Sequence, residues 1–189
     1  MTPATSITPD ASLKSRFSCL LGEKTALSQF TANDITSEYL SWLNDPEVVK
    51  YSNQRFRTHT LATCMDYFTS FASTENLFIK VERKTDGLFV GTMTAYYNSA
   101  HRTVDIGIML GRRTVWGSGL GQDAWRTLLA WLLAQDSVRK VTAGTMRCNR
   151  AMVRLMEHSG MTLEAVRPQQ ELLDGMPQDL LYYGVFHVA

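Results

Sequence analysis

The spacing of apolar residues changes character several times along the chain. Residues 35–43 and 61–71 carry apolar side chains three and four positions apart, which predicts two amphipathic helices. Asp34 is expected to cap the first helix and Pro46 to end or reset it. The period then shortens: segments rich in β-branched and aromatic residues, separated by turn residues, predict strands. A short strand is expected at 26–30, and an antiparallel meander at 77–83, 88–97 and 103–110.

The second half of the chain alternates between helical and extended patterns. The elements expected there are a helix from the glycine-rich segment 117–121 to about residue 136, a strand at 138–144, a helix at 150–158, and strands at 163–172 and 180–187. A strand, helix, strand order requires a crossover, so part of the sheet is expected to be parallel. The whole order predicts an α/β or α+β layer fold.

Length and composition indicate a globular protein with a single domain. The chain has 189 residues, of which 44% are hydrophobic and 20% charged, which fits one globular domain. Residues 1–15 are rich in Thr, Ser and Pro, so we expect a flexible N-terminal tail followed by a single domain at 16–189. A net charge of +1 gives no bulk attraction to nucleic acid, and no apolar run is long enough to span a membrane.

The cysteines and histidines offer no metal site by their spacing. The three cysteines, Cys19, Cys64 and Cys148, are far apart and form no CxxC pair, so neither a zinc site nor a disulfide framework is expected. Reduced cysteines and the absence of a secretory pattern at the N-terminus favour a cytoplasmic protein.

The segment between the third meander strand and the next helix carries the most chemistry. It reads LGRRTVWGSGLG from Leu110 to Gly121. Glycines at a helix start let an anion approach free backbone amides, so this turn is suited to a diphosphate; a tight strand-to-helix connection is the alternative. The Lys of a P-loop is absent after Gly121, and G-x-G-x-G after an antiparallel meander does not match the dinucleotide fingerprint.

These motifs together resemble a known family. The strand VDIGIML at 104–110, the turn WGSGLG at 116–121, and Asn149 before a helix that ends at Gly160 are similar to the GNAT superfamily of N-acetyltransferases. Within it, the chain most resembles the branch of the ribosomal-protein N-terminal acetyltransferases RimJ and RimL. The resemblance implies a mixed, mostly antiparallel central sheet of six to seven strands flanked by about four helices.

The resemblance also implies acetyl-CoA as co-substrate, with no metal. Coenzyme A would lie where two parallel strands part, its diphosphate on the turn and its pantetheine beside Asn149. The implied cofactor-binding residues are Ile108, Met109, Leu110, Arg112, Arg113, Trp116, Gly117, Ser118, Gly119, Leu120, Gly121 and Asn149. The tyrosine acid that many members carry seven residues after the asparagine is replaced by Met156, so a non-catalytic acyl-CoA-binding module is the alternative to an enzyme.

Acetyl transfer to an amine needs a base, because an alkyl amine is protonated at neutral pH. Asp105 matches an acid that this branch often carries and is the expected base; the alternative is an ion pair with Arg102. Tyr182 lies on the last strand and is a candidate acid or acceptor-site residue, with packing in the sheet as the alternative.

The family's acceptor pocket is built from the first helices, their connection and the last strands. Here the connection is basic and aromatic, and we expect Tyr51, Arg55 and Arg57 to bind the substrate. A nucleotide-linked amino sugar would suit these side chains, and a protein N-terminal amine, as in RimJ and RimL, is the competing acceptor. A solvated basic loop is the alternative. Dimers are common in the family, so a homodimer stays open.

Overall fold

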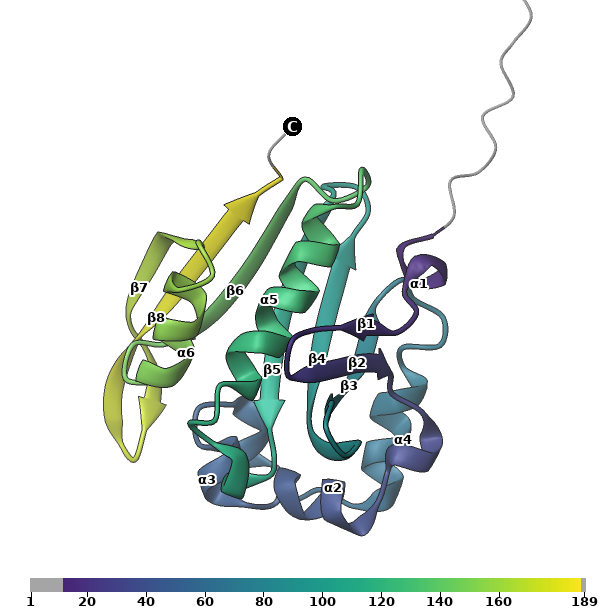
Figure 1. The fold of residues 1–189 in the computed structure, drawn as a ribbon. Coiled ribbons are helices and arrows are strands. Elements are labelled where there is room, and N and C mark those ends of the chain that lie inside the picture. The colour runs from purple at the N-terminus through teal and green to yellow at the C-terminus, as the bar shows by residue number, and fades with distance from the viewer. Residues whose placement is uncertain (1–11, 188–189) are drawn as a thin grey trace, which may run out of the picture.

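The computed structural model describes residues 12–187 of the chain (Figure 1). Residues 1–11 of the expected tail lie outside this range, but the rest of the tail is helical. Helix α1 (Leu13–Arg16) buries Leu13, and the Lys14 ammonium donates to the Phe71 carbonyl at 2.5 Å. The expected tail boundary at residue 15 is therefore wrong, because Leu13 is an apolar anchor that packs into the core.

Eight strands form one continuous sheet in the described part of the chain (Figure 1). They are β1 (Leu20–Leu21), β2 (Thr25–Gln29), β3 (Leu77–Arg83), β4 (Leu88–Asn98), β5 (Thr103–Leu110), β6 (Lys140–Met146), β7 (Thr162–Leu173) and β8 (Met176–Phe186). Their spatial order is β1-β2-β3-β4-β5-β6-β8-β7, and only β5 and β6 pair in parallel. The mixed, mostly antiparallel sheet is confirmed; the sequence did not predict the two-residue strand β1.

The main helices are α2 (Ser37–Leu43), α4 (Leu61–Thr69), α5 (Leu120–Leu133) and α6 (Arg150–Glu157), in agreement with the expected number. Shorter turns connect them: α3 (Pro46–Val49) and the 3-10 turns η1 (Ala32–Asp34), η2 (Asn53–Phe56) and η3 (Arg113–Val115). Within residues 12–187, no helix is both long and apolar enough to cross a membrane.

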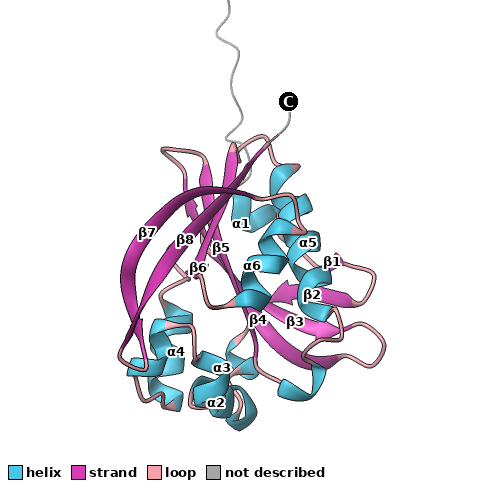
Figure 2. Ribbon diagram, turned by 90° about the vertical axis from the view of Figure 1, so that its left-hand side faces the viewer, coloured by secondary structure: helices cyan, strands magenta, loops and turns pink. Residues whose placement is uncertain are grey.

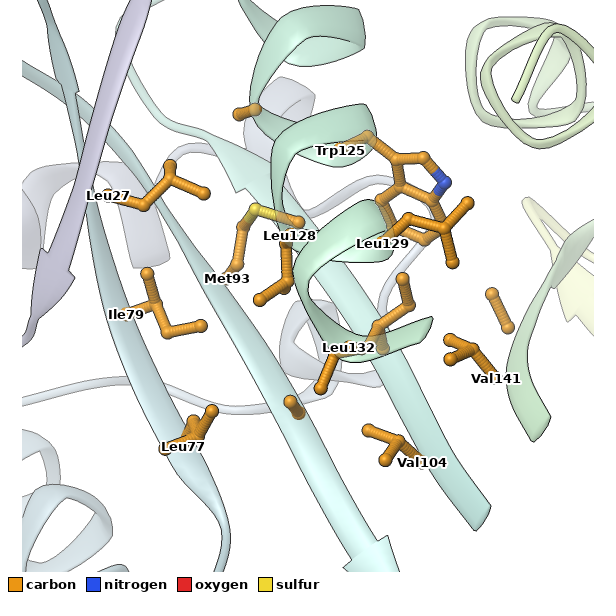
Figure 3. Close-up of a cluster of buried hydrophobic side chains, with 14 of the residues drawn as sticks. Leu27, Leu77, Ile79, Met93, Val104, Trp125, Leu128, Leu129, Leu132 and Val141 are labelled. Carbon is orange, nitrogen blue, oxygen red and sulfur yellow. The ribbon is translucent and has the colours of Figure 1, made fainter. Parts of the chain in front are cut away.

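The two faces of the sheet carry separate hydrophobic cores. Helices α5 and α6 cover one face, whereas α2, α3 and α4 gather over the other (Figure 2). Neighbouring residues along a strand alternate between the cores: Ile79 packs on the α5 side and Phe78 on the α2 side. Figure 3 shows the α5 core, with Trp125, Leu128, Leu129 and Leu132 of the helix beside Leu27, Leu77, Ile79, Met93, Val104 and Val141 of the strands.

The start of the first amphipathic helix differs from the sequence prediction. The Asp34 carboxylate accepts hydrogen bonds from the amide and hydroxyl of Thr31, at 2.8 and 2.7 Å, and so closes the separate turn η1. Helix α2 begins three residues later and is capped by Thr36, whose hydroxyl oxygen accepts from the amide of Tyr39 at 3.2 Å. The predicted cap at Asp34 is wrong because the Asp34 carboxylate accepts its hydrogen bonds from Thr31 and not from the first amides of α2.

Candidate active site

The parallel strands β5 and β6 stay paired over only part of their length. Their register joins Thr103, Val104 and Asp105 to Lys140, Val141 and Thr142. Beyond this point β5 continues to Leu110 beside β4, while β6 continues to Met146 beside β8. The two strands therefore part just after Asp105 and leave backbone groups on both sides of the gap without a strand partner.

The hydrogen-bond pattern decides which β5 amides face this gap. The amide of Gly111 donates to the carbonyl of Val90 at 3.0 Å, in register with the β4–β5 ladder. Because alternate residues of an antiparallel strand bond to the partner, the main chains of Ile108 and Leu110 point away from β4 and towards the gap. The main chain of Met109 points to β4 and its side chain joins the α2 core. Two of the three β5 residues predicted to hold the cofactor thus present backbone groups to the gap.

The glycine turn that follows β5 leaves the start of α5 uncapped. Gly117 and Gly119 adopt positive φ angles of 76° and 86°, a region that strongly favours glycine. The first backbone bond of the helix runs from the Asp123 amide to the Gly119 carbonyl at 3.1 Å. No side chain caps the helix, and the amides at positions 120–122 have no acceptor among the described residues.

Such an arrangement of free amides fits an anion. Unpaired N–H groups and the helix dipole both favour negative charge at this end of α5. The turn is also open: a Cβ built on Gly117 would meet nothing within 4 Å. A diphosphate bound at this turn would therefore have hydrogen-bond donors available to it.

The polar side chains of the turn are engaged elsewhere. Arg112 forms an ion pair with Glu38 of α2 and donates to the Phe89 carbonyl at 3.3 Å. Arg113 lies 3.6 Å from the carboxylate of Asp45, the N-cap of α3. The indole N–H of Trp116 donates to the Leu110 carbonyl at 2.8 Å, and the Ser118 hydroxyl donates to the carbonyl of Val115. These contacts tie the turn to α2, α3 and β5. The role of these four side chains in binding the cofactor stays a prediction.

Asn149 caps helix α6. Its side-chain oxygen accepts from the Met152 amide at 3.3 Å, and its amide nitrogen donates to the Thr145 hydroxyl at 3.0 Å. This arrangement explains an asparagine at this position by structure alone. A contact with pantetheine would be additional to that role.

A cavity of about 250 Å³ opens beside the point where β5 and β6 part. Asp105 and Tyr182 point to the face of the sheet that carries α2 to α4, because their neighbours along the strands, Val104 and Ile106, and Leu181 and Tyr183, belong to the α5 core on the other face. The cavity is lined by Tyr51, Asn53, Asp105, Gly144, Thr145, Met146, Glu171, Leu180 and Tyr182. Asp105 and Tyr182, the two residues predicted to act in catalysis, thus meet at one cavity.

Asp105 has a polar partner but no cationic one. The Thr142 hydroxyl donates to its carboxylate at 2.8 Å, and no ion pair involving Asp105 forms within residues 12–187. The alternative pairing with Arg102 does not occur, since that guanidinium donates to the Asp136 carbonyl. The carboxylate is open to the solvent of the cavity, yet enough protein surrounds it that desolvation raises the pKa of Asp105, an effect that the Thr142 hydrogen bond partly offsets.

The two adjacent tyrosines of β8 occupy opposite faces. Tyr182 is half-buried in the cavity wall, paired with Gly144 of β6, and the Arg167 guanidinium lies 5.0 Å from the centre of its ring. Tyr183 is buried in the α5 core and donates to Glu157 of α6 at 3.0 Å. Only Tyr182 therefore has access to a molecule in the cavity.

The basic connection contributes unevenly to the cavity. Tyr51 lines it directly. Arg55 is tied to the β7–β8 hairpin: it donates to the Leu172 carbonyl at 3.0 Å and lies 3.5 Å from the Glu171 carboxylate. Arg57 is exposed and does not line the cavity. The structure thus brings one of the three predicted substrate residues into the cavity wall and places Arg55 behind Glu171.

Sequence reasoning missed Thr142 and Glu171. The register that sets Thr142 beside Asp105 depends on a parallel pairing that joins segments 37 residues apart. Glu171 reaches the cavity because the β7–β8 ladder shifts register between Arg167 and Glu171, where Gln169 has a φ of 51°. A non-glycine residue with positive φ leaves no signature in the sequence, so nothing there indicated this bulge.

Comparison with known protein families gives one clear match. The profile of the acetyltransferase (GNAT) domain matches residues 24–162, which include β2 to β6 and both the glycine turn and Asp105. No curated protein matches the sequence.

Solved structures share the fold at low sequence identity. An acetyltransferase of the GNAT family from Bacillus anthracis is 17% identical with a TM-score of 0.76, over 89% of this chain and 98% of the other. RimL, a ribosomal alpha-N-protein acetyltransferase in complex with coenzyme A, is 11% identical with a TM-score of 0.79, over 89% and 97%. Spermidine N-acetyltransferase from Vibrio cholerae, in complex with CoA and spermine, is 15% identical with a TM-score of 0.77, over 87% and 96%.

Proposed function

Because the chain belongs to the acetyltransferase (GNAT) family and is an acetyl-CoA-dependent N-acetyltransferase, we propose that it acetylates a primary alkyl amine bound in the cavity beside Asp105. Acetyl-CoA supplies the acetyl group as a thioester. The amides of Ile108 and Leu110 would hold its pantetheine arm, and the free amides at 120–122 would hold its diphosphate. The gap between β5 and β6 would join these two places to the cavity.

Asp105 is the proposed base. An alkyl ammonium with a pKa near 10 must lose a proton before its nitrogen can attack a carbonyl carbon. A carboxylate that lacks a cationic partner, and whose pKa is raised by desolvation, binds such an ammonium and accepts its proton more readily than an ordinary aspartate. The observation that carries this proposal is the position of this unpaired carboxylate in the cavity wall, where the parallel strands part.

Tyr182 is the proposed acid. When the amide bond forms and the thioester bond breaks, the departing sulfur carries a negative charge and needs a proton. The side chain of Tyr182 lines the same cavity as Asp105, and its hydroxyl is a suitable donor. Met156, which stands where many family members carry their tyrosine, is fully buried and has no proton to give. A second tyrosine in the cavity therefore supports turnover rather than cofactor binding alone.

The charges around the cavity favour a cationic acceptor. Its ionisable side chains are Asp105, Glu171 and two tyrosines. Of the arginines close to its wall, Arg55 pairs with Glu171, and the guanidinium of Arg167 lies 5.0 Å from the centre of the Tyr182 ring. A phosphate group would find no uncommitted cation among the lining residues, which weighs against a nucleotide-linked amino sugar. An ammonium would be attracted by both carboxylates, as in an aliphatic polyamine or a protein N-terminus. We propose a small alkyl amine as the acceptor.

The test is thiol release from acetyl-CoA in the presence of three amine classes: aliphatic di- and polyamines, peptides with free N-termini, and nucleotide-linked amino sugars. We expect the aliphatic amines to give the highest kcat/KM. Glu171→Gln should raise KM for these amines with little change in kcat, and Glu164→Gln, on the same strand and paired with Lys140, is the matched control. A preference for the nucleotide-linked sugar would contradict the proposed acceptor. If none of the amines supported thiol release, the proposed function itself would be contradicted.

A further inference from the structure

The turn between β1 and β2 is pressed against the first turn of α5. A Cβ on Gly22 would lie 2.3 Å from the Asp123 carboxylate, so only glycine permits this approach. The Asp123 carboxylate accepts four hydrogen bonds from the turn: the amides of Glu23, Lys24 and Thr25, at 3.0, 3.0 and 2.8 Å, and the Thr25 hydroxyl at 2.6 Å. The turn is thereby fixed to the helix.

These bonds also occupy the negative charge of Asp123. Burial alone would raise the pKa of Asp123, but the hydrogen bonds from Thr25 and the three amides outweigh it and lower the pKa. The carboxylate therefore stays ionised, and its oxygens are directed at the turn between β1 and β2. It holds the backbone of Lys24, while the ammonium of Lys24 has no carboxylate partner among the described residues.

The side chain of Lys24 reaches the glycine turn. Its ammonium donates to the Ser118 carbonyl at 3.1 Å and would lie 3.0 Å from a Cβ on Gly119. Lys24 is exposed, so its three donors are not all used by that one carbonyl. It is thus a cation held beside the uncapped amides of α5, where Arg112 and Arg113 are committed to Glu38 and Asp45.

We infer that Lys24 is a cofactor-binding residue whose ammonium contacts the diphosphate of coenzyme A. The inference rests on the proposed diphosphate site at the start of α5. An ammonium beside free amides adds a charge-assisted contact that the amides alone do not supply. The hairpin of β1 and β2 then has a function: Asp123 fixes a lysine to a site formed almost a hundred residues later in the chain.

The test compares Lys24→Met with Lys84→Met. Lys84 is the matched control because its ammonium donates to the Gly22 carbonyl of the same turn at 3.1 Å and has no contact with residues 117–121. Binding of coenzyme A is measured by calorimetry, without turnover. We expect Lys24→Met to raise the Kd for coenzyme A by about tenfold, the size of one exposed charge-assisted hydrogen bond, with a smaller effect at high salt. Lys84→Met should leave the Kd within about twofold of the wild type.

Shortened ligands identify the group that Lys24 contacts. The same rise in Kd is expected with 3′-dephospho-CoA, which keeps the diphosphate, whereas KM for acetyl-pantetheine, which lacks all phosphates, should not change. A loss confined to intact coenzyme A would assign Lys24 to the 3′-phosphate and overturn the inference. An equal loss with acetyl-pantetheine would show a structural effect and also overturn it. If the wild type binds coenzyme A and Lys24→Met binds it with the same Kd, this inference alone is overturned. If the wild type does not bind coenzyme A, the proposed diphosphate site is overturned as well.

Discussion

Replacement of Asp105 by Asn removes the proposed base while keeping its shape. The amide oxygen of Asn can still accept the Thr142 hydroxyl, which lies 2.8 Å from the carboxylate, so the cavity wall is preserved. Loss of a general base typically costs 10² to 10⁴ in rate. We therefore expect kcat/KM to fall by about two to four orders of magnitude, which is about 3 to 5 kcal/mol of transition-state free energy.

The assay compares the activity of the variant with two other properties, its affinity for coenzyme A and its melting temperature, neither of which should decrease. Asp105 does not touch the glycine turn, so the Kd for coenzyme A should stay at the wild-type value. The melting temperature should not fall, because a carboxyl whose folded pKa is raised binds more protons folded than unfolded. Its charge therefore costs stability once the pH exceeds 3.8, and an uncharged Asn avoids that cost.

Two results would refute this reasoning. Near-wild-type turnover in Asp105→Asn would show that the proton leaves by another route. A loss of activity that follows a lower melting temperature and weaker cofactor binding would show that Asp105 supports the fold instead. In the wild type, kcat/KM should rise with pH as Asp105 loses its proton, with a midpoint above the ordinary aspartate value.

Three further substitutions test separate parts of the site. Thr142→Val removes the hydrogen bond that holds the pKa of Asp105 down, so the acidic limb of the kcat/KM profile should move to higher pH; an unmoved limb would assign it to another group. Tyr182→Phe keeps the ring under Arg167 but removes the hydroxyl, and kcat should fall about a hundredfold with KM for the amine nearly unchanged; full activity would mean the tyrosine only packs. Gly119→Ala puts a side chain at a φ of 86°, which should cost about 1 to 2 kcal/mol in unfolding free energy and weaken coenzyme A binding; urea unfolding and calorimetry check both, and unchanged values would contradict the role given to this turn.

The local elements of the fold could be predicted from sequence because their signals are local. Strand β5 was expected at the residues that form it, since a run of β-branched and apolar side chains is bounded by turns at both ends. The helix α5 follows from its leucine spacing and the glycines before it. The strand β1 has two residues and the helix α1 has four, so neither is long enough to repeat a pattern of apolar and polar positions that would predict it.

The candidate site could be predicted only where its residues lie on one element. Asp105 and the glycine turn are close in sequence and fit one motif. Lys24, Thr142 and Glu171 come from elements that meet only in the folded chain, through a hairpin contact, a parallel register and a bulge. The basic connection was misleading about charge for the same reason, because the acid that neutralises Arg55 is more than a hundred residues away.

A crystal structure of the protein with acetyl-CoA would test the central claim most directly. We predict that oxygens of the diphosphate lie within hydrogen-bonding distance, about 2.7–3.2 Å, of backbone nitrogens at positions 120–122, and that the thioester carbon lies in the gap next to the Asp105 carboxylate. A diphosphate bound away from these amides, or a thioester that does not reach the cavity, would contradict the account.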